Sequence, residues 1–260
     1  MPYYTPPPPG FGTKPPGKAR RIWGIVILVV GVLPLLAGAA VFAANVKDGR
    51  ITQFNDAYAP KAWHNLRSDV LFPDKLSDVG SRLENPGWVR QGIAKPAQCD
   101  EVLSGKLRQQ ATDGGCKTVL RATYVDNGGE AAATVSLIVL RDSAAAKELS
   151  DQYVDVAETA GPTVKPYPVP KTEASSWSKS NALAGYITQM SAGTSPTPYV
   201  LALSTGPLDP ERSWGQLPAP WKFAQESEVR AYERLTGTMA RIAGGHINEV
   251  IRWGVPTDDA

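Results

Sequence analysis

The chain has 260 residues, with 27 basic and 25 acidic side chains and a formal net charge of +2. This even charge balance provides no electrostatic footprint for nucleic acid, so we expect no nucleic-acid partner. The length suffices for one ordinary domain with its own hydrophobic core, together with shorter segments on either side of it.

Residues 1–21 form a proline-rich, basic tail, in which seven of the first 16 residues are Pro. Such a segment cannot bury a core, so we expect it to be disordered and to populate the polyproline II conformation. Two interpretations remain open. The tail is a ligand for an aromatic-lined groove on a cytoplasmic partner, or its basic end contacts anionic lipid.

Residues 22–46 carry no formal charge over 25 positions and consist mostly of Ile, Val, Leu, Ala and Gly. A helix of this length reaches roughly 37 Å, which exceeds the roughly 30 Å hydrocarbon core of a bilayer. We therefore predict a single transmembrane helix and a location at the cell membrane. The alternative is a cleaved signal peptide, whose apolar run is usually shorter, at about 7 to 15 residues.

The flanking charges predict how this helix is oriented. All charged residues before it are basic, whereas the segment after it begins with basic and acidic residues mixed. Because Lys and Arg near a span stay preferentially in the cytoplasm, we expect the N-terminus inside the cell and the C-terminal domain outside it. The basic residues of the tail are Lys14, Lys18, Arg20 and Arg21.

A proline-rich tail before a single span, with this usage of Ala, Gly, Val and Arg, resembles many uncharacterised membrane proteins of GC-rich actinobacteria. The resemblance covers composition and layout, and it brings no catalytic motif with it.

Glycines within the predicted span are regularly spaced. Gly24, Gly31 and Gly38 recur every seven residues, so they would lie on nearly one face of a helix. They indicate either a seam for self-association of the helix or the general enrichment of glycine in membrane spans.

Residues 47–95 have a mixed composition with an interrupted apolar stripe at helical spacing. This pattern favours a juxtamembrane helix or stalk, which can dock on the domain that follows. The stripe consists of Phe54, Ala57, Tyr58, Trp63, Leu66 and Val70, and Pro60 interrupts it.

Residues 96–253 are predicted to form one extracytoplasmic domain. It begins with a helix from about Pro96, and two β-type runs follow, residues 117–126 and 130–141. They are joined by Asn-Gly-Gly, which is a strong hairpin signal. The side chains of Leu120, Ala122 and Tyr124 share one face of the first strand, which we expect to be the core face.

The second half of this domain has a similar order of elements. Taken together, the pattern predicts an α+β fold of order α-β-β-α-β-β-α, with a four-stranded, mainly antiparallel sheet and helices packed on one face. Residues 254–260 are expected to be a disordered C-terminus. The later elements are a helix from Ser143 to about Thr159, a Pro-rich connection over 161–170, strands over 182–191 and 199–205, a helix over 225–243 and a short helix over 246–253.

Cys99 and Cys116 are the two cysteines of the chain. We expect them outside the cell, where disulfides form and persist. A bridge that closes about 15 residues is worth roughly 3 kcal/mol in the chain-entropy model. Zinc binding is the competing interpretation, but it needs more ligands than two cysteines without a nearby histidine. The sequence therefore predicts a disulfide, no metal site and no cofactor.

The sequence contains none of the nucleophile, metalloprotease or nucleotide-binding motifs, and its histidines are His64 and His246. We therefore predict no catalytic residue. The aromatic loop over 206–223 is more suggestive, because Trp214 and Trp221 there are accompanied by four prolines. These indoles either form a partner surface or fold back to cover the sheet.

These observations leave two classes of function. The first is a noncatalytic domain for binding, sensing or scaffolding at the cell envelope, held by a single-pass anchor. Its partners would be the lipid bilayer, an envelope protein or polymer, and a second copy of the chain through the span. The alternative is a membrane-anchored envelope enzyme with an unrecognised active site. Converging carboxylates in a cleft would favour the enzyme.

Overall fold

A computed structural model of the chain describes residues 36, 38–42, 57–77, 87–154, 164–193, 195–209 and 228–253. The chain divides into two compact units, Met1–Ile51 and Thr52–Ala260, and the elements below belong to the second. The expected tail over 1–21, most of the expected span over 22–46 and the C-terminus over 254–260 lie outside the described residues. Among the described residues, no helix combines the length and apolar character needed to cross a membrane.

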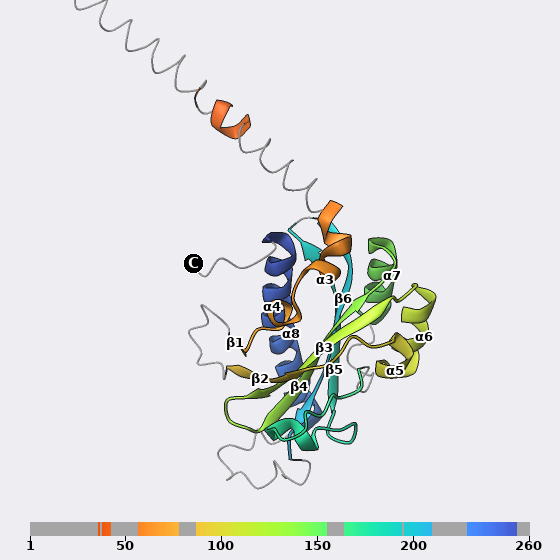
Figure 1. The fold of residues 1–260 in the computed structure, drawn as a ribbon, viewed down its shortest axis with the longest axis vertical. Helices are drawn as coiled ribbons and strands as arrows, with labels where there is room; N and C mark the ends of the chain where they lie inside the picture. The colour runs from red at the N-terminus through yellow and green to blue at the C-terminus, as the bar shows by residue number, and fades with distance from the viewer. Residues whose placement is uncertain are drawn as a thin grey trace, which may run out of the picture. The chain divides into compact units, whose positions relative to one another are not determined.

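The second unit is built on a six-stranded antiparallel sheet of order β1-β2-β3-β4-β6-β5 (Figure 1). The predicted four-stranded sheet is therefore wrong. The two additional strands, β1 and β2, come from residues 47–95, where the sequence suggested a stalk. The strands are β1 (Lys75–Leu76), β2 (Trp88–Ile93), β3 (Thr118–Asp126), β4 (Ala131–Val139), β5 (Ala184–Ala192) and β6 (Ser195–Pro207).

Helices cover both faces of this sheet, so the expectation that they pack on one face is also wrong. On the first face lie η2 (Ala59–Lys61), α3 (Ala62–Asn65), α4 (Ser68–Leu71) and the long α8 (Glu228–Trp253). On the second face lie α5 (Cys99–Val102), α6 (Gly105–Asp113) and α7 (Ser143–Val154). Figure 1 shows α8 and α7 on opposite sides of the strands.

The β3–β4 hairpin is confirmed, with Leu120 opposite Leu137 and Tyr124 opposite Ala133. Leu120 and Tyr124 are at most 5% exposed and face the core under α8, as predicted. The opposite face of β3 is buried as well, because Val119 and Thr123 are 0% exposed. Burial on both faces explains why apolar residues occur on both sides of the strand, with Val119 on one side and Leu120 and Tyr124 on the other.

Residues 57–76 pack into the core of the first face. Leu71, Phe72 and Leu76 are each at most 4% exposed and belong to the same cluster as α8. The Tyr199 hydroxyl of β6 donates to the Ala59 carbonyl and accepts from the Trp63 backbone N–H at 3.3 Å. The segment expected to be a stalk is thus an integral part of the fold.

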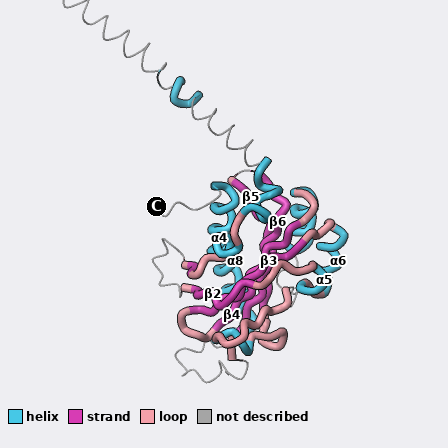
Figure 2. The backbone as a smooth tube through the Cα atoms, viewed as in Figure 1, coloured by secondary structure: helices cyan, strands magenta, loops and turns pink. Residues whose placement is uncertain are grey.

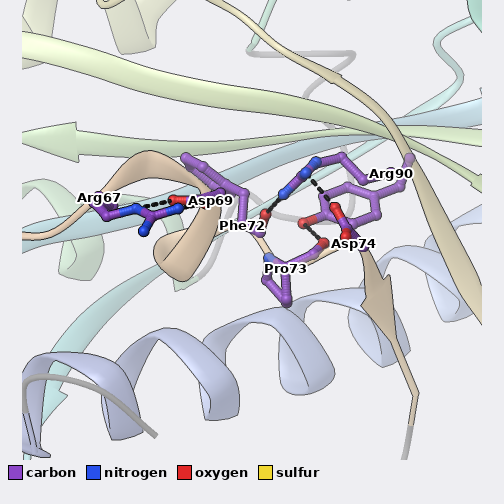
Figure 3. Close-up of polar contacts among 7 residues, drawn as sticks. Arg67, Asp69, Phe72, Pro73, Asp74 and Arg90 are labelled. Atoms are coloured by element: carbon purple, nitrogen blue, oxygen red, sulfur yellow. Dashed lines mark hydrogen bonds and ion pairs between the residues drawn. The ribbon is translucent and has the colours of Figure 1, made fainter.

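Arg90 of β2 binds the segment 57–76 through polar contacts. Its guanidinium donates to the Phe72 carbonyl and to the Asp74 carboxylate (Figure 3). The Tyr124 hydroxyl donates to the Pro73 carbonyl at 3.0 Å. The Arg90 side chain is 17% exposed and the Asp74 side chain 85% exposed, so the ion pair is shielded from water on the arginine side and open to water on the aspartate side. These bonds fix residues 72–74 at the point where the chain enters β1.

Helix α8 runs without interruption through Gly244 and Gly245, where the sequence suggested a break between two helices. A Cβ at Gly244 would stand 3.3 Å from the Leu201 side chain of β6. The glycine therefore allows the helix to approach the sheet closely, and the gain in packing outweighs its low helix propensity. Tyr232, Met239 and Ile242 are buried against the sheet, as their spacing predicted.

Residues 164–169, which we call the crossing segment, run over the second face of the sheet across β6, β4, β3 and β2. Beneath them lies one row of directly opposed residues, Ser204, Thr134, Thr123 and Gly92. The Ser204 hydroxyl donates to the Val164 carbonyl at 2.6 Å. The segment is teal in Figure 1 and drawn as loop in Figure 2.

The hydroxyls in this row satisfy the backbone of the crossing segment near Tyr167. Thr123 Oγ1 donates to the Tyr167 carbonyl at 2.6 Å, and Thr134 Oγ1 accepts from the Tyr167 N–H at 3.0 Å. Trp177, which is fully buried, also donates its indole N–H to Thr134 at 2.8 Å. Side chains in the sheet thus replace the strand pairing that a buried backbone otherwise requires.

Candidate functional site

The predicted disulfide is present between Cys99 and Cys116, whose Cα atoms are 6.4 Å apart. It joins the first residue of α5 to the residues just before β3. Helix α5 in turn holds the start of the crossing segment, because the Lys165 N–H donates to the Val102 carbonyl at 2.8 Å. Leu103 and Val164 form an isolated antiparallel bridge at the same place, and this bridge separates α5 from α6.

Most of the other residues singled out from the sequence lie outside the described part of the chain. Trp214 and Trp221 lie outside the described residues, as do Gly24 and Gly31, so the partner surface and the helix seam remain predictions. Gly38 is described; it is helical and exposed.

Both histidines contact neighbouring residues of the fold. The His64 ring lies against Trp63, with ring centroids 3.5 Å apart. A ring nitrogen of His246 on α8 is 2.8 Å from the Val70 carbonyl of α4, so this residue links the two helices. In the described part of the chain, no three or more His, Cys, Asp or Glu residues are grouped so that they could hold a metal ion.

A cavity of about 610 Å³ opens where the crossing segment reaches the end of the sheet at β2. We call it the β2 cavity. Its volume lies within the range of roughly 300–1,000 Å³ that is usual for ligand sites. It is lined by Val89 and Gln91 of β2, Asp126 and Asn127 of the β3–β4 turn, and Lys171, Thr172 and Glu173 at the start of η3 (Glu173–Ser176).

Gln91 enters the cavity from a β-bulge. The pairing of β2 with β3 runs from Arg90 opposite Tyr124 to Gly92 opposite Thr123, so Gln91 is the extra residue. Bulges redirect a side chain and increase the local twist, and they are enriched near binding sites. Next to the bulge, a Cβ on Gly92 would stand 2.8 Å from Val169, so glycine is required for the crossing segment to lie this close to β2.

Lys171 enters from the opposite wall with a strained backbone. Its φ of 65° makes it the one non-glycine residue with a positive φ in the described part of the chain. The turn around it is closed by bonds from the Val169 N–H to the Ala174 carbonyl at 3.3 Å and from the Thr172 hydroxyl to the Val169 carbonyl at 2.8 Å. Strain of this kind persists where the surrounding structure enforces it, and it is common at binding sites.

Several polar groups of the cavity are already committed to the fold. The Asp126 carboxylate accepts backbone N–H bonds from Gly128, Glu130 and Ala131 at 2.6 to 3.1 Å. With its amide oriented by the hydrogen-bond network, Asn127 pairs with both backbone groups of Gly87, at 3.1 and 3.2 Å. These residues form the rigid wall of the site.

Three groups of the lining remain available for a ligand. Within the described part of the chain, the Lys171 ammonium and the Glu173 carboxylate have no polar partner, and both side chains are exposed. The Gln91 amide makes a single long contact, 3.4 Å to the carbonyl of Val89. A cation, an anion and an amide thus surround one cavity on a rigid frame.

A second cavity, of about 190 Å³, lies between α6 and α7 and is smaller than the usual ligand site. Its main polar groups are Gln110, Asp113, Glu148 and Gln152, and the Gln110 amide donates to Gln152 there. This bond already uses the amide nitrogen of Gln110 and the amide oxygen of Gln152. We therefore regard the β2 cavity as the candidate functional site.

No known protein family, curated protein or solved structure matches the chain.

None of the available groups was singled out from the sequence. Gln91, Lys171 and Glu173 occur in segments without periodicity, and no motif connects them. The Asn-Gly-Gly turn, which the sequence did identify, supplies one wall of the cavity through Asp126 and Asn127. The Pro-Lys-Thr sequence at 170–172 is a weak indication of the turn at Lys171. In a type II β-turn, proline is common at the second position and the third position requires a positive φ.

Proposed function

We propose that this chain is a noncatalytic binding domain of the cell envelope, held at the outer side of the membrane through the apolar segment 22–46, and that the β2 cavity is its ligand site. The observation that carries the binding function is the presence of three available polar groups around one cavity of ligand size. The charge-free composition of 22–46 and the basic residues before it support the location.

The arrangement favours binding over catalysis. The lysine and glutamate are exposed, so water screens both charges. The histidines are elsewhere, because His246 bonds to the Val70 carbonyl and His64 lies against Trp63. A preorganised wall with mobile charged side chains at its rim suits reversible recognition of a polar ligand.

The ligand site can be tested in intact cells with a photo-crosslinking amino acid at position 91. We expect a crosslinked envelope component when the probe replaces Gln91, and none when it replaces Arg108, an exposed residue of α6. Equal crosslinking at the two positions, or none at position 91, would count against the cavity as a binding site.

The location can be tested separately with protease added to spheroplasts. The domain from residue 57 onward should be digested, while a tag at residue 1 should be protected. Protection of the domain with loss of the tag would reverse the proposed orientation. Recovery of the whole chain in the soluble fraction would refute the membrane attachment.

A further inference from the structure

We propose that the ligand of the β2 cavity is a short peptide, bound with its carboxylate against Lys171, its ammonium or an N–H donor against Glu173, and an amide group against Gln91. The inference rests on the proposed function and identifies the chemical class of its ligand. It starts from the three available groups, which are a full cation, a full anion and a neutral amide.

The two charges lie two residues apart on one turn, with Thr172 between them. The hydroxyl of Thr172 donates to Val169 at 2.8 Å and accepts from the Ala174 N–H at 3.2 Å, so the backbone that carries both charges is fixed. The Cα positions of Lys171 and Glu173 are therefore fixed, although the ends of both side chains are free to move. A ligand that meets both charges must carry opposite charges of its own, as a zwitterion does.

The charged groups that line the cavity restrict the chemical class of the ligand further. A polyanion would meet Lys171 favourably but would be repelled by Glu173 and by Asp126, which also lines the cavity. A polycation would be attracted by Glu173 and Asp126 but repelled by Lys171. A neutral glycan could bond to the amide but would use neither charge. Because a primary amide such as Gln91 offers both a donor and an acceptor, it matches the main-chain amide of a peptide.

The strain at Lys171 agrees with this assignment. Glycine would adopt a φ of 65° without penalty, yet a lysine occupies the position. The unfavourable conformation is explained if the ammonium is needed at the rim of the cavity, where a ligand carboxylate would be bound.

The proposal is tested by titrating the full-length protein, purified in detergent, with trialanine that has free termini, and by following backbone amide NMR shifts of the cavity residues. The same titration is repeated with C-amidated and with N-acetylated trialanine. We expect the free peptide to bind, and we expect amidation or acetylation each to weaken binding about fivefold, because exposed ion pairs contribute modestly.

Variants of the protein then test which residue binds each end of the peptide. In Lys171→Gln the penalty for amidation should disappear while the penalty for acetylation remains, and in Glu173→Gln the reverse should hold. Gln91→Ala should weaken all three peptides equally. The matched controls are Lys179→Gln and Glu148→Gln, exposed residues that do not line the cavity, and these should bind as the native chain does.

Equal penalties for amidation in the native chain and in Lys171→Gln would overturn the assignment of the carboxylate. Shifts at Gln91, Asn127 and Thr172 with maltose but not with trialanine would overturn the peptide inference while leaving the cavity as a binding site. No shift with either probe would also overturn the inference. In that case, the crosslinking at position 91 would decide whether the proposed function fails with it.

Discussion

Replacing Lys171 with glycine should make the protein more stable. A left-handed backbone costs an L-residue about 1–2 kcal/mol, whereas the greater freedom of glycine in the unfolded chain costs roughly 0.5–1 kcal/mol. Lys171 has a φ of 65° and an exposed side chain without a polar partner among the described residues, so little is lost when the side chain is removed. The midpoints of these two ranges leave a net gain of about 0.75 kcal/mol, which corresponds to roughly 1.5–3 °C in Tm for a domain of this size.

The measurement is urea denaturation and thermal melting of the full chain, followed by circular dichroism. Two controls separate strain from side-chain loss. Lys171→Ala keeps the unfavourable φ and should show no gain. Lys179→Gly changes an exposed lysine whose φ is not positive, and it should lose roughly 0.5–1 kcal/mol. If Lys171→Gly is no more stable than Lys171→Ala, the turn is not strained and the reasoning about this residue is refuted.

Three further outcomes are expected. Replacing Cys99 and Cys116 together by serine should lower the free energy of unfolding by roughly 3 kcal/mol in urea titrations without reductant, and an unchanged midpoint would show that the bridge does not stabilise the fold. A truncated chain that begins at residue 96 should fail to melt cooperatively, while one that begins at residue 57 should do so. The shorter chain lacks Leu71, Phe72, Leu76 and Trp88, each worth about 1.5–3 kcal/mol of burial, and cooperative melting of it would contradict this account. Burial raises the pKa of Tyr199 to about 12, so this hydroxyl stays protonated in the folded state while the unfolded chain, with a tyrosine pKa of about 10, loses its proton. Its contribution to stability is complete below pH 10 and is lost as the pH rises toward 12; Tyr199→Phe should flatten this dependence between pH 10 and 12, and a native chain without any decline there would contradict the assignment.

The parts of the fold that the sequence predicted correctly are those in which local chemistry and periodicity agree. The Asn-Gly-Gly turn between two apolar runs identified the β3–β4 hairpin. The spacing of Tyr232, Met239 and Ile242 identified the buried side of α8. In both cases the pattern within about 20 residues determines the structure without reference to distant segments.

The failures have a shared physical cause, since the missing elements depend on distant backbone contacts. Strand β2 has no alternating pattern, because Gln91 is bulged and Gly92 lies beneath Val169. The first-face helices of residues 57–71 are only three or four residues long and are held by contacts to β6 and α8. The β2 cavity follows from the same contacts, so its available groups could not be recognised from spacing.

The way in which the crossing segment is bound has a consequence for how this protein can vary in evolution. Its bonds to the sheet use the backbone groups of Val164 and Tyr167, whereas the sheet contributes the hydroxyls of Thr123, Thr134 and Ser204. Side chains at 166 and 168, which are half-buried and exposed, are therefore free to change among related sequences, whereas the Lys165 ammonium donates to the Glu101 carbonyl at 2.7 Å. The three hydroxyls are not, because valine or alanine in their place would leave a buried carbonyl or N–H without a partner. Relatives of this chain should thus be recognised by a row of small hydroxyl residues in their strands, even where the exposed positions of the segment above that row have diverged.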